Sequence, residues 1–302
     1  MKIPVEVNNI ILNNYDGFIF DLDGTIYRGQ KLLPGAEQVI AEIKNQSKSH
    51  VFLSNKPIAR RDNYAEKLTR LGIDTTVTEV INSSWVTADY LQQNYPAEPV
   101  YVISEMSLME EIAEAGVKVV NKSSDDFAGR IVAGDVSMAE FLHFQQENYE
   151  YEDIVCLVIS FDRTFHYGRL NDALQIIKAR DDIEIIATNP DNTCPIAGGE
   201  VPDAASMIAA VEAAGERKID KIMGKPSEHM IKTAIAAMGF DRQDQSHNFL
   251  MLGDRLQTDI KMGIRAGIDT ALVLSGVTGR KTLEDSDLSP NYVLDSVGEL
   301  LK

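Results

Sequence analysis

The chain has 302 residues, of which 44% are hydrophobic and 25% charged, and its formal net charge is −17. This composition is typical of a globular protein that buries a large core in one or two domains. The negative charge argues against nucleic acid and anionic membranes as partners, because both are polyanions that such a surface repels. An anionic substrate would therefore need local cations.

No apolar stretch is long enough for a signal peptide or a membrane span, so we expect a cytoplasmic protein. Cys156 and Cys194 are the only cysteines, and they lie far apart without a CxxC motif, which favours free thiols in a reducing compartment. Cys156 lies in an apolar run and is expected to pack in the core. Cys194 lies in a polar segment that we interpret as a loop, and its role stays open.

Short apolar runs alternate with longer amphipathic ones, a pattern typical of βα units that build a parallel sheet. We therefore predict an α/β protein with a Rossmann-like parallel-sheet core. The predicted strands are 17–21, 50–53, 100–103, 117–120, 154–160, 183–187, 249–252 and 270–274. The predicted helices are 36–44, 65–71, 83–91, 170–179, 204–214, 227–238 and 260–266.

Two polar segments interrupt this alternation and mark predicted domain boundaries. Tyr95-Pro96-Ala97-Glu98-Pro99 carries two prolines, and Gly215-Glu216-Arg217-Lys218 is polar and begins with glycine. Residues 1–97 and 219–302 are predicted to form the catalytic core. Residues 98–218 are predicted to form a second, smaller α/β domain inserted into it.

Three aspartates follow predicted buried strands. Asp21 ends the first strand, Asp23 comes two residues later, and Asp254 follows the strand that ends at Leu252. Because parallel strands deliver their last residues to one edge of a sheet, the three carboxylates should converge there. Each like-charged pair would cost about 4 kcal/mol at ~4 Å and an effective dielectric of ~20, which a divalent cation such as Mg²⁺ would offset.

These residue types suit phosphoryl transfer. Asp21 is placed to attack phosphorus as a nucleophile, and Asp23 to protonate the leaving oxygen and then activate water. The negative charge that spreads over the phosphoryl oxygens calls for a metal, a fixed cation and hydrogen-bond donors. Lys225, at the start of a predicted helix, can be the cation and Ser54 a donor, while Asp254 would bind the metal.

Asp259 follows Asp254 closely and is expected either to bind the metal or to hold a water beside it. Taken alone, each of these polar residues is explained more simply as a turn, a helix cap or a surface charge. Four such signals at the carboxyl ends of separate βα units are hard to explain in that way. Their joint occurrence therefore indicates a catalytic site.

Four segments of the chain resemble the four motifs of the haloacid dehalogenase superfamily. They are Asp21-Leu22-Asp23-Gly24-Thr25, Leu53-Ser54-Asn55, Gly224-Lys225-Pro226 and Gly253-Asp254-Arg255-Leu256-Gln257-Thr258-Asp259. The insertion between the second and third motifs resembles the α/β cap of the nitrophenylphosphatase, sugar-phosphate and phosphoglycolate phosphatase branch, whose relatives include pyridoxal phosphatase. The resemblance covers nearly the whole chain and implies a phosphatase.

The resemblance also implies a role for each matching residue. Asp21 would be the nucleophile, forming a phosphoaspartyl intermediate, and Asp23 the acid and base. The phosphate ligands would be Ser54, Asn55 and Lys225, with contact to the cap as an alternative for Asn55.

The cofactor implied by the resemblance is Mg²⁺. It would be held by Asp21, Asp254 and the main-chain carbonyl of Asp23, with Asp259 as a ligand or a second-layer partner.

The inserted domain carries a stretch similar to this branch of the superfamily, from Ala187 to Asp191, and the loop after it should face the substrate. Asn189 and Asp191 are therefore candidate substrate contacts. Cys194 stands where pyridoxal phosphatase relatives can have a histidine, which argues against vitamin phosphates as substrates.

Two cations are candidates for the mouth of the site. Lys56 stands where many relatives have a second asparagine, although a solvated lysine is the simpler alternative. Arg255 is the other candidate, and it could instead pair with acidic neighbours such as Asp259.

The predicted substrate is a small phosphorylated metabolite, with sugar phosphates favoured and a broad range that includes p-nitrophenyl phosphate. A site roofed by a cap admits a small ester better than a phosphoprotein. A phosphotransferase or mutase on the same core and a non-catalytic sugar-phosphate sensor remain alternatives. The resemblance also suggests a homodimer formed through the cap.

Overall fold

The computed structural model describes residues 10–121, 137, 139–140, 150–196, 198–241 and 247–302. Contacts within the chain divide it into two compact units. Unit 1 comprises Met1–Asn55, Arg61–Asn82 and Lys225–Lys302, and unit 2 comprises Lys56–Arg60 and Ser83–Gly224. Unit 1 is therefore built from segments that precede and follow most of unit 2 in the sequence.

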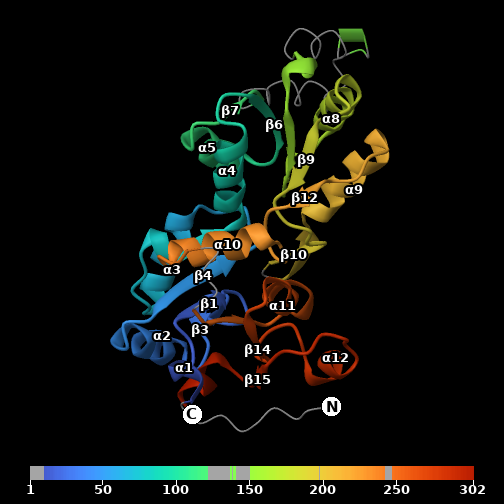
Figure 1. Ribbon diagram of the computed structural model, residues 1–302. Helices are drawn as coiled ribbons and strands as arrows, with labels where there is room; N and C mark the ends of the chain where they lie inside the picture. Colours follow the sequence, from blue (N-terminus) through green and yellow to red (C-terminus); the bar gives the residue numbers. More distant parts are fainter. Residues whose placement is uncertain (1–9, 122–136, 138, 141–149, 197, 242–246) are drawn as a thin grey trace. The chain divides into compact units, whose positions relative to one another are not determined.

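Unit 1 contains a six-stranded sheet in the order β15-β14-β13-β1-β4-β5 (Figure 1). Its strands are β1 (Gly17–Asp21), β4 (Ser49–Ser54), β5 (Val80–Asn82), β13 (Phe249–Gly253), β14 (Asp269–Val273) and β15 (Tyr292–Leu294). Every pairing is parallel, and Phe20 of β1 is the register partner of both Leu252 and Phe52. The carboxyl ends of β1, β4 and β13 therefore lie at one edge.

The strand order of this sheet reverses at β1. From β1 the chain moves to β4 and β5 on one side, and it later returns to β13, β14 and β15 on the other. In open α/β sheets such a reversal leaves a crevice outside the carboxyl ends of the two central strands. β1 and β13 are buried at every position, as expected for strands covered on both faces.

Helices and short turns complete unit 1. The helices are α1 (Ile10–Asn13), α2 (Ala36–Asn45), α3 (Arg61–Leu71), α10 (Glu228–Ala237), α11 (Lys261–Ala266) and α12 (Arg280–Glu284). The remaining elements are the hairpin β2 (Tyr27–Arg28) and β3 (Lys31–Leu32), the 3-10 turns η1 (Val77–Glu79) and η4 (Val297–Leu301), and the π-helical turn η3 (Leu256–Ile260). In α2, Val39, Ile40 and Ile43 form the buried face that the sequence pattern predicts.

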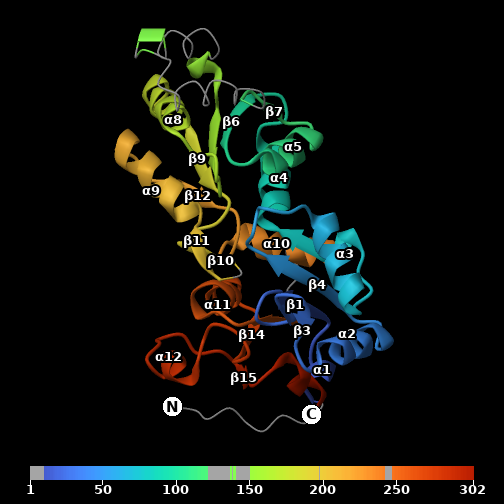
Figure 2. The same ribbon diagram turned by 180° about the vertical axis from the view of Figure 1, so that it is seen from behind.

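Unit 2 contains a second parallel sheet, in the order β12-β9-β8-β6-β7. Its strands are β6 (Pro99–Ile103), β7 (Lys118–Val119), β8 (Cys156–Ile159), β9 (Glu184–Ala187) and β12 (Lys221–Ile222), and the hairpin β10 (Thr193–Ile196) and β11 (Gly199–Pro202) is separate. The helices are α4 (Ser83–Asn94), α5 (Met106–Glu114), α8 (Tyr167–Ala179) and α9 (Ala204–Gly215), with the 3-10 turn η2 (Tyr151–Asp153). In both views α4 and α5 lie on one face of this sheet and α8 and α9 on the other (Figures 1 and 2).

One hydrophobic cluster of unit 2 lies between its sheet and the α8–α9 pair. Tyr101, Leu157 and Ile185 come from three neighbouring strands and pack with Ile176 of α8 and Val211 of α9.

Among the described residues, no helix combines the length and apolar character that crossing a bilayer requires.

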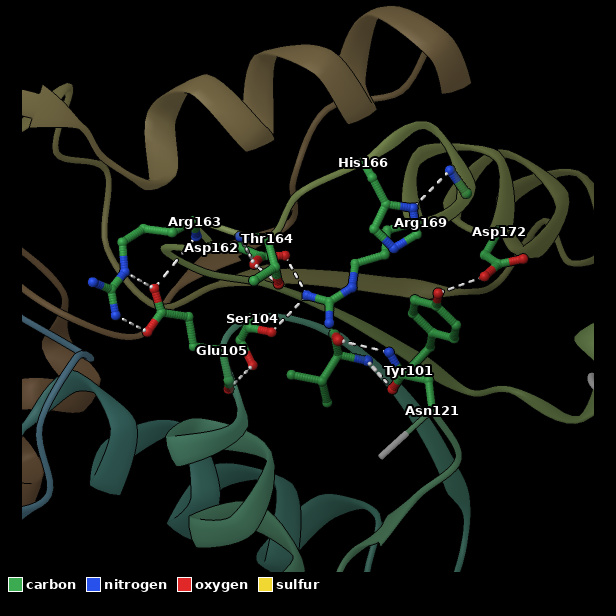
Figure 3. Close-up of polar contacts among 12 residues, drawn as sticks. Tyr101, Ser104, Glu105, Asn121, Asp162, Arg163, Thr164, His166, Arg169 and Asp172 are labelled. Carbon is green, nitrogen blue, oxygen red and sulfur yellow. Dashed lines mark hydrogen bonds and ion pairs between the residues drawn. The ribbon is translucent and has the colours of Figure 1, made fainter. Parts of the chain in front are cut away.

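A buried ion pair lies just beyond the carboxyl ends of β6 and β8 (Figure 3). Asp162 and Arg169 are 1% and 2% exposed, and the Arg169 guanidinium donates to the Asp162 carboxylate and, over 2.6 Å, to the carbonyl of Ser104. Asp162 also accepts from the main-chain N–H (2.8 Å) and hydroxyl (2.7 Å) of Thr164. β6 and β8 flank the reversal of strand order in this sheet, so paired side chains occupy its ligand-binding position.

We expect Arg169→Met to destabilise the protein by about 3–5 kcal/mol, because it leaves the Asp162 carboxylate buried without its cation. Urea unfolding measures the loss. Arg163→Ala is the matched control, because it removes an exposed arginine that pairs with Glu105. An Arg169→Met effect as small as that of the control would contradict a contribution of the buried pair.

The predicted α/β class, with a parallel-sheet core and a second α/β unit, is confirmed, but the units divide at different residues from those predicted. The first boundary falls before Ser83 instead of after residue 97, and the second after Gly224 instead of after residue 218. α4 belongs to unit 2 because it packs on α5 and because the Tyr90 hydroxyl donates to Glu184 of β9 over 2.9 Å. β12 belongs there because it pairs with β9.

Several short elements are absent from the sequence prediction, among them β5, β15, α5 and the hairpin β10–β11. Cys194, interpreted as a loop residue, lies on β10 opposite Val201 and is 3% exposed. The loop interpretation was wrong because a polar segment can alternate exposed and buried residues when it pairs as a hairpin. Cys156 is buried in β8 as predicted, and neither of the two cysteines, both of which the structure describes, forms a disulfide.

Candidate active site

β1 delivers Asp21 to the carboxyl edge of the six-stranded sheet. The side chain is buried, and its Oδ1 forms an ion pair with Lys225 Nζ. The buried Thr25 hydroxyl lies 3.4 Å from Asp21 Oδ2. The first strand of the sheet thus ends in a carboxylate, and a lysine 204 residues later in the sequence contacts it.

Lys225 contacts a second carboxylate, that of Asp259. The distance from Lys225 Nζ to Asp259 Oδ1 is 2.7 Å, and both residues are buried. Asp259 lies in the π-helical turn η3, where its Oδ2 accepts from the main-chain N–H of Arg255 over 3.1 Å. A Cβ at Gly253 would lie 2.2 Å from the Asp259 Cβ, so β13 can end this close to Asp259 only with glycine there.

Asp254 directly follows β13 and is 1% exposed. Its Oδ2 accepts from the main-chain N–H of Val277 over 2.7 Å, whereas its Oδ1 has no hydrogen-bond partner within the described part of the chain. Two glycines make room for this carboxylate, since a Cβ at Gly24 would lie 2.5 Å from Oδ2 and one at Gly276 only 1.9 Å from it. A buried carboxylate oxygen without a donor is costly unless it binds a cation.

The carboxylates of Asp21, Asp254 and Asp259 form one group, with an oxygen from each lying within 4.8 Å of the others. Three carboxylates and the ammonium of Lys225 carry two net negative charges when all are ionised. A divalent cation with oxygen ligands would bring this buried total to zero. The donor set and the unpartnered Asp254 Oδ1 therefore fit Mg²⁺.

Burial and the excess of negative charge also shift the pKa values of the side chains in this group. Burial, opposed by Lys225 but assisted by the charges of Asp259 and Asp254, raises the pKa of Asp21 to about 8. Burial and the charge of Asp259 raise the pKa of Asp254 to about 6. Burial alone would lower the pKa of Lys225, but Asp21 and Asp259 outweigh it and raise that pKa, so the lysine stays a cation.

The other predicted residues of the core motifs lie nearby in unit 1 with different contacts. Ser54 is buried at the end of β4, and its hydroxyl lies 3.3 Å from that of Tyr64. The Asn55 side chain hydrogen-bonds the main chain of Lys225. Asp23 is partly exposed and its carboxylate is outside the acidic group, so a metal contact through its main-chain carbonyl stays a prediction.

The predicted substrate contacts of unit 2 divide into two sets. Asn189 is fully buried, and its Nδ2 donates to Asp191 Oδ2 and Asp203 Oδ1, each over 3.1 Å. Asp191 precedes the hairpin β10–β11 and Asp203 follows it, so the hydrogen bonds from Asn189 connect the two ends of the hairpin. Cys194 lies within the hairpin, and Lys56 is partly exposed and contributes a positive charge that acts on Asp203.

Arg255 had two predicted roles, and its main chain is the part that meets Asp259. The Arg255 N–H donates to the Asp259 carboxylate, and the Asp259 N–H donates to the Arg255 carbonyl over 3.1 Å. The side chain is partly exposed. A role for its guanidinium at the mouth of the site stays a prediction.

The sequence prediction missed the segment from Ser275 to Val277, which closes the site behind Asp254. Besides the Val277 N–H, this segment supplies the Ser275 hydroxyl, which donates to the Gly24 carbonyl over 2.7 Å. The signal that identified the other motifs was present here as well, because small polar residues follow the end of β14 at the same edge of the sheet.

We expect Gly276→Ala to lower the apparent affinity for Mg²⁺ and to lower turnover by about 10²-fold, because the new methyl would displace the Asp254 carboxylate. Steady-state kinetics over a range of Mg²⁺ concentrations measures both effects. Gly279→Ala is the matched control, since a Cβ there meets no atom within 4 Å. Equal kinetics for the two variants would contradict the proposed crowding.

The apparent affinity for Mg²⁺ should rise with pH between about 6 and 8, by up to about tenfold per unit, and then level off. Below its raised pKa of about 8, Asp21 holds a proton in the metal-free protein, and metal binding must release it. Calorimetric titration in buffers of different ionisation enthalpy measures both affinity and proton release. An affinity that does not change with pH would contradict this assignment.

The metal-free protein should lose stability as pH rises from the ordinary aspartate pKa through about 8, because the folded protein keeps the Asp21 proton over this range.

The fold and the acidic group together define a two-unit α/β protein with a candidate metal-dependent active site. Two family models match the chain: one described as haloacid dehalogenase-like hydrolase matches residues 18–118, and one described as HAD-hydrolase-like matches residues 222–300. Together they cover more than half of the sequence. The chain belongs to the haloacid dehalogenase-like hydrolases.

Individual relatives match nearly the full length. The chain is 35% identical to the sugar-phosphatase AraL of Bacillus subtilis over 95% of this chain and 92% of that protein. It is 30% identical to the human glycerol-3-phosphate phosphatase over 100% of this chain and 94% of that protein. Among solved structures, the 4-nitrophenylphosphatase of Thermotoga maritima matches with a TM-score of 0.78 and 29% identity, over 96% of this chain and 98% of that one.

Proposed function

We propose that the protein is a Mg²⁺-dependent phosphatase that hydrolyses small phosphomonoesters, sugar phosphates above all. The observation that carries this proposal is the buried group of Asp21, Asp254 and Asp259 around Lys225. When all four side chains are ionised, this group carries two net negative charges. Its position, at the reversal of strand order in a parallel sheet, is where such folds bind ligands.

In the proposed reaction, an oxygen of the Asp21 carboxylate attacks phosphorus, and the bond from phosphorus to the ester oxygen breaks. Asp23 donates a proton to the departing oxygen and so releases the alcohol. Asp23 then takes a proton from water, whose oxygen attacks the phosphoaspartyl group. Inorganic phosphate leaves and the Asp21 carboxylate is restored.

Asp21, Asp254 and Asp259 are the side chains that could hold Mg²⁺. When bound, the metal would offset negative charge on the carboxylates and on the phosphoryl oxygens. Lys225 supplies a fixed cation beside the nucleophile, and it is held there by Asp259. This pair preorganises positive charge where the transition state concentrates negative charge.

The substrate class is supported by the relatives, whose names give sugar phosphate, glycerol 3-phosphate and 4-nitrophenyl phosphate chemistry. A small organic phosphate is common to all three. We propose Asn189, Asp191, Cys194, Lys56 and Arg255 as the residues to test for substrate discrimination. A homodimer formed through the inserted domain also remains a proposal, as does the cytoplasmic location, which is supported by two described cysteines that form no disulfide.

Asp21→Asn should lower turnover by at least about 10³-fold, because the amide keeps the shape of the side chain but is a poor nucleophile. The measurement is release of inorganic phosphate from a panel of sugar phosphates, glycerol 3-phosphate and p-nitrophenyl phosphate, with Mg²⁺ or with a chelator. Circular dichroism checks that the variant is folded.

Asp62→Asn is the matched control, because it removes an exposed carboxylate from α3 of the same unit. Its turnover should equal that of the wild type. Full activity of Asp21→Asn would refute the nucleophile assignment. A wild type that releases no inorganic phosphate by itself but forms a new phosphate ester when a second alcohol is added would point to a phosphotransferase instead.

A further inference from the structure

The side chain of Asn55 makes a two-point contact with the main chain of Lys225, a residue 170 positions away in the sequence. The Lys225 N–H donates to Asn55 Oδ1 over 2.6 Å, and Asn55 Nδ2 donates to the Lys225 carbonyl over 3.1 Å. One hydrogen bond would fix a distance, whereas two bonds to the same residue also fix the direction of its backbone. Asn55 therefore constrains where the Lys225 side chain starts.

The surroundings of Lys225 show why such a constraint is needed. The preceding residue, Gly224, donates its N–H to the Thr188 carbonyl over 2.8 Å, and both of these residues belong to unit 2. Lys225 itself belongs to unit 1. The main chain thus passes between the two units at the Gly224–Lys225 bond, and the Asn55 amide binds the first residue on the unit 1 side.

Asn55 is also well placed relative to the nucleophile. It follows β4, and Leu53 on that strand is the register partner of Asp21. The parallel pairing of β4 with β1 fixes Asn55 near the end of β1. A residue anchored to that strand pair can therefore hold Lys225 against Asp21.

We infer that Asn55 is a positioning residue for Lys225 rather than a phosphate ligand, an inference that rests on the proposed phosphatase function. Its amide orients the lysine backbone, so that Nζ reaches both Asp21 and Asp259. Asparagine suits this task because its amide offers one acceptor and one donor in a plane, matching the N–H and carbonyl of a single residue. Aspartate keeps only the acceptor, and alanine keeps neither.

A double-mutant cycle tests the inference. Asn55→Ala should lower kcat/KM for p-nitrophenyl phosphate by about 10²-fold, the loss typical of a misplaced catalytic group. In the Lys225→Ala background the same change should cost less than about threefold, because the residue it positions is gone. Losses that multiply would show that Asn55 acts on the substrate by itself and would overturn the inference. Asn63→Ala, an exposed change in α3, is the control.

A crystal structure of Asn55→Ala provides a readout that does not depend on turnover. We expect Lys225 Nζ to move beyond ion-pair distance of Asp259, with the main chain of β4 unchanged. A lysine that stays in place while activity falls would overturn the inference. If Asn55→Ala does not fold, Asn55→Asp, which should keep the acceptor bond and an intermediate activity, replaces it in both experiments.

The failure of this inference can be told apart from failure of the phosphatase proposal. A wild type without turnover on the substrate panel would refute the proposed function, whatever the variants do. An active wild type whose Asn55 and Lys225 losses multiply would refute only the positioning role.

Discussion

The excess of buried negative charge at the carboxyl edge of the first sheet is the constraint on which the site depends. Three buried carboxylates surround one buried ammonium, so the group carries two unbalanced negative charges when all of its members are ionised. Such an arrangement opposes folding, because desolvation penalises each charge and like charges repel. Burial and the charges of Asp259 and Asp254 raise the pKa of Asp21 even beside Lys225. A divalent cation would offset this excess of negative charge.

The site also depends on close packing of the main chain against these carboxylates. Gly24, Gly253 and Gly276 each stand where a side chain would overlap Asp254 or Asp259. Of the three, only Gly24 has a positive φ, of 93°, so for the other two the need for glycine is a matter of space rather than of backbone conformation. The glycines let main-chain N–H groups approach, as Val277 does toward Asp254, and thereby fix the carboxylates before any ligand binds.

Much of this arrangement is predictable from the sequence, because each motif follows a strand whose apolar pattern is local. Parallel topology then brings the strand ends together, which places Asp21 and Asp254 at one edge of the six-stranded sheet. Lys225 comes instead from the segment between β12 and α10, and its side chain pairs with Asp21. What the sequence does not reveal is set by contacts between distant segments. The hydrogen bonds between the Asn55 amide and the main chain of Lys225 join residues 170 positions apart, and the hairpin around Cys194 depends on pairing that its polar residues do not signal.

The two sheets share one topological feature but differ in the charges that lie beside it. Each has a reversal of strand order, and each places charged side chains beyond the carboxyl ends of the two central strands. In unit 2 one carboxylate, Asp162, meets one guanidinium, Arg169, and their charges cancel. In unit 1 Lys225 faces more carboxylates than it can neutralise. A balanced pair needs no ligand, whereas an unbalanced group of ionised carboxylates favours binding of a cation, so the charge count supports the proposal that the chemistry takes place in unit 1.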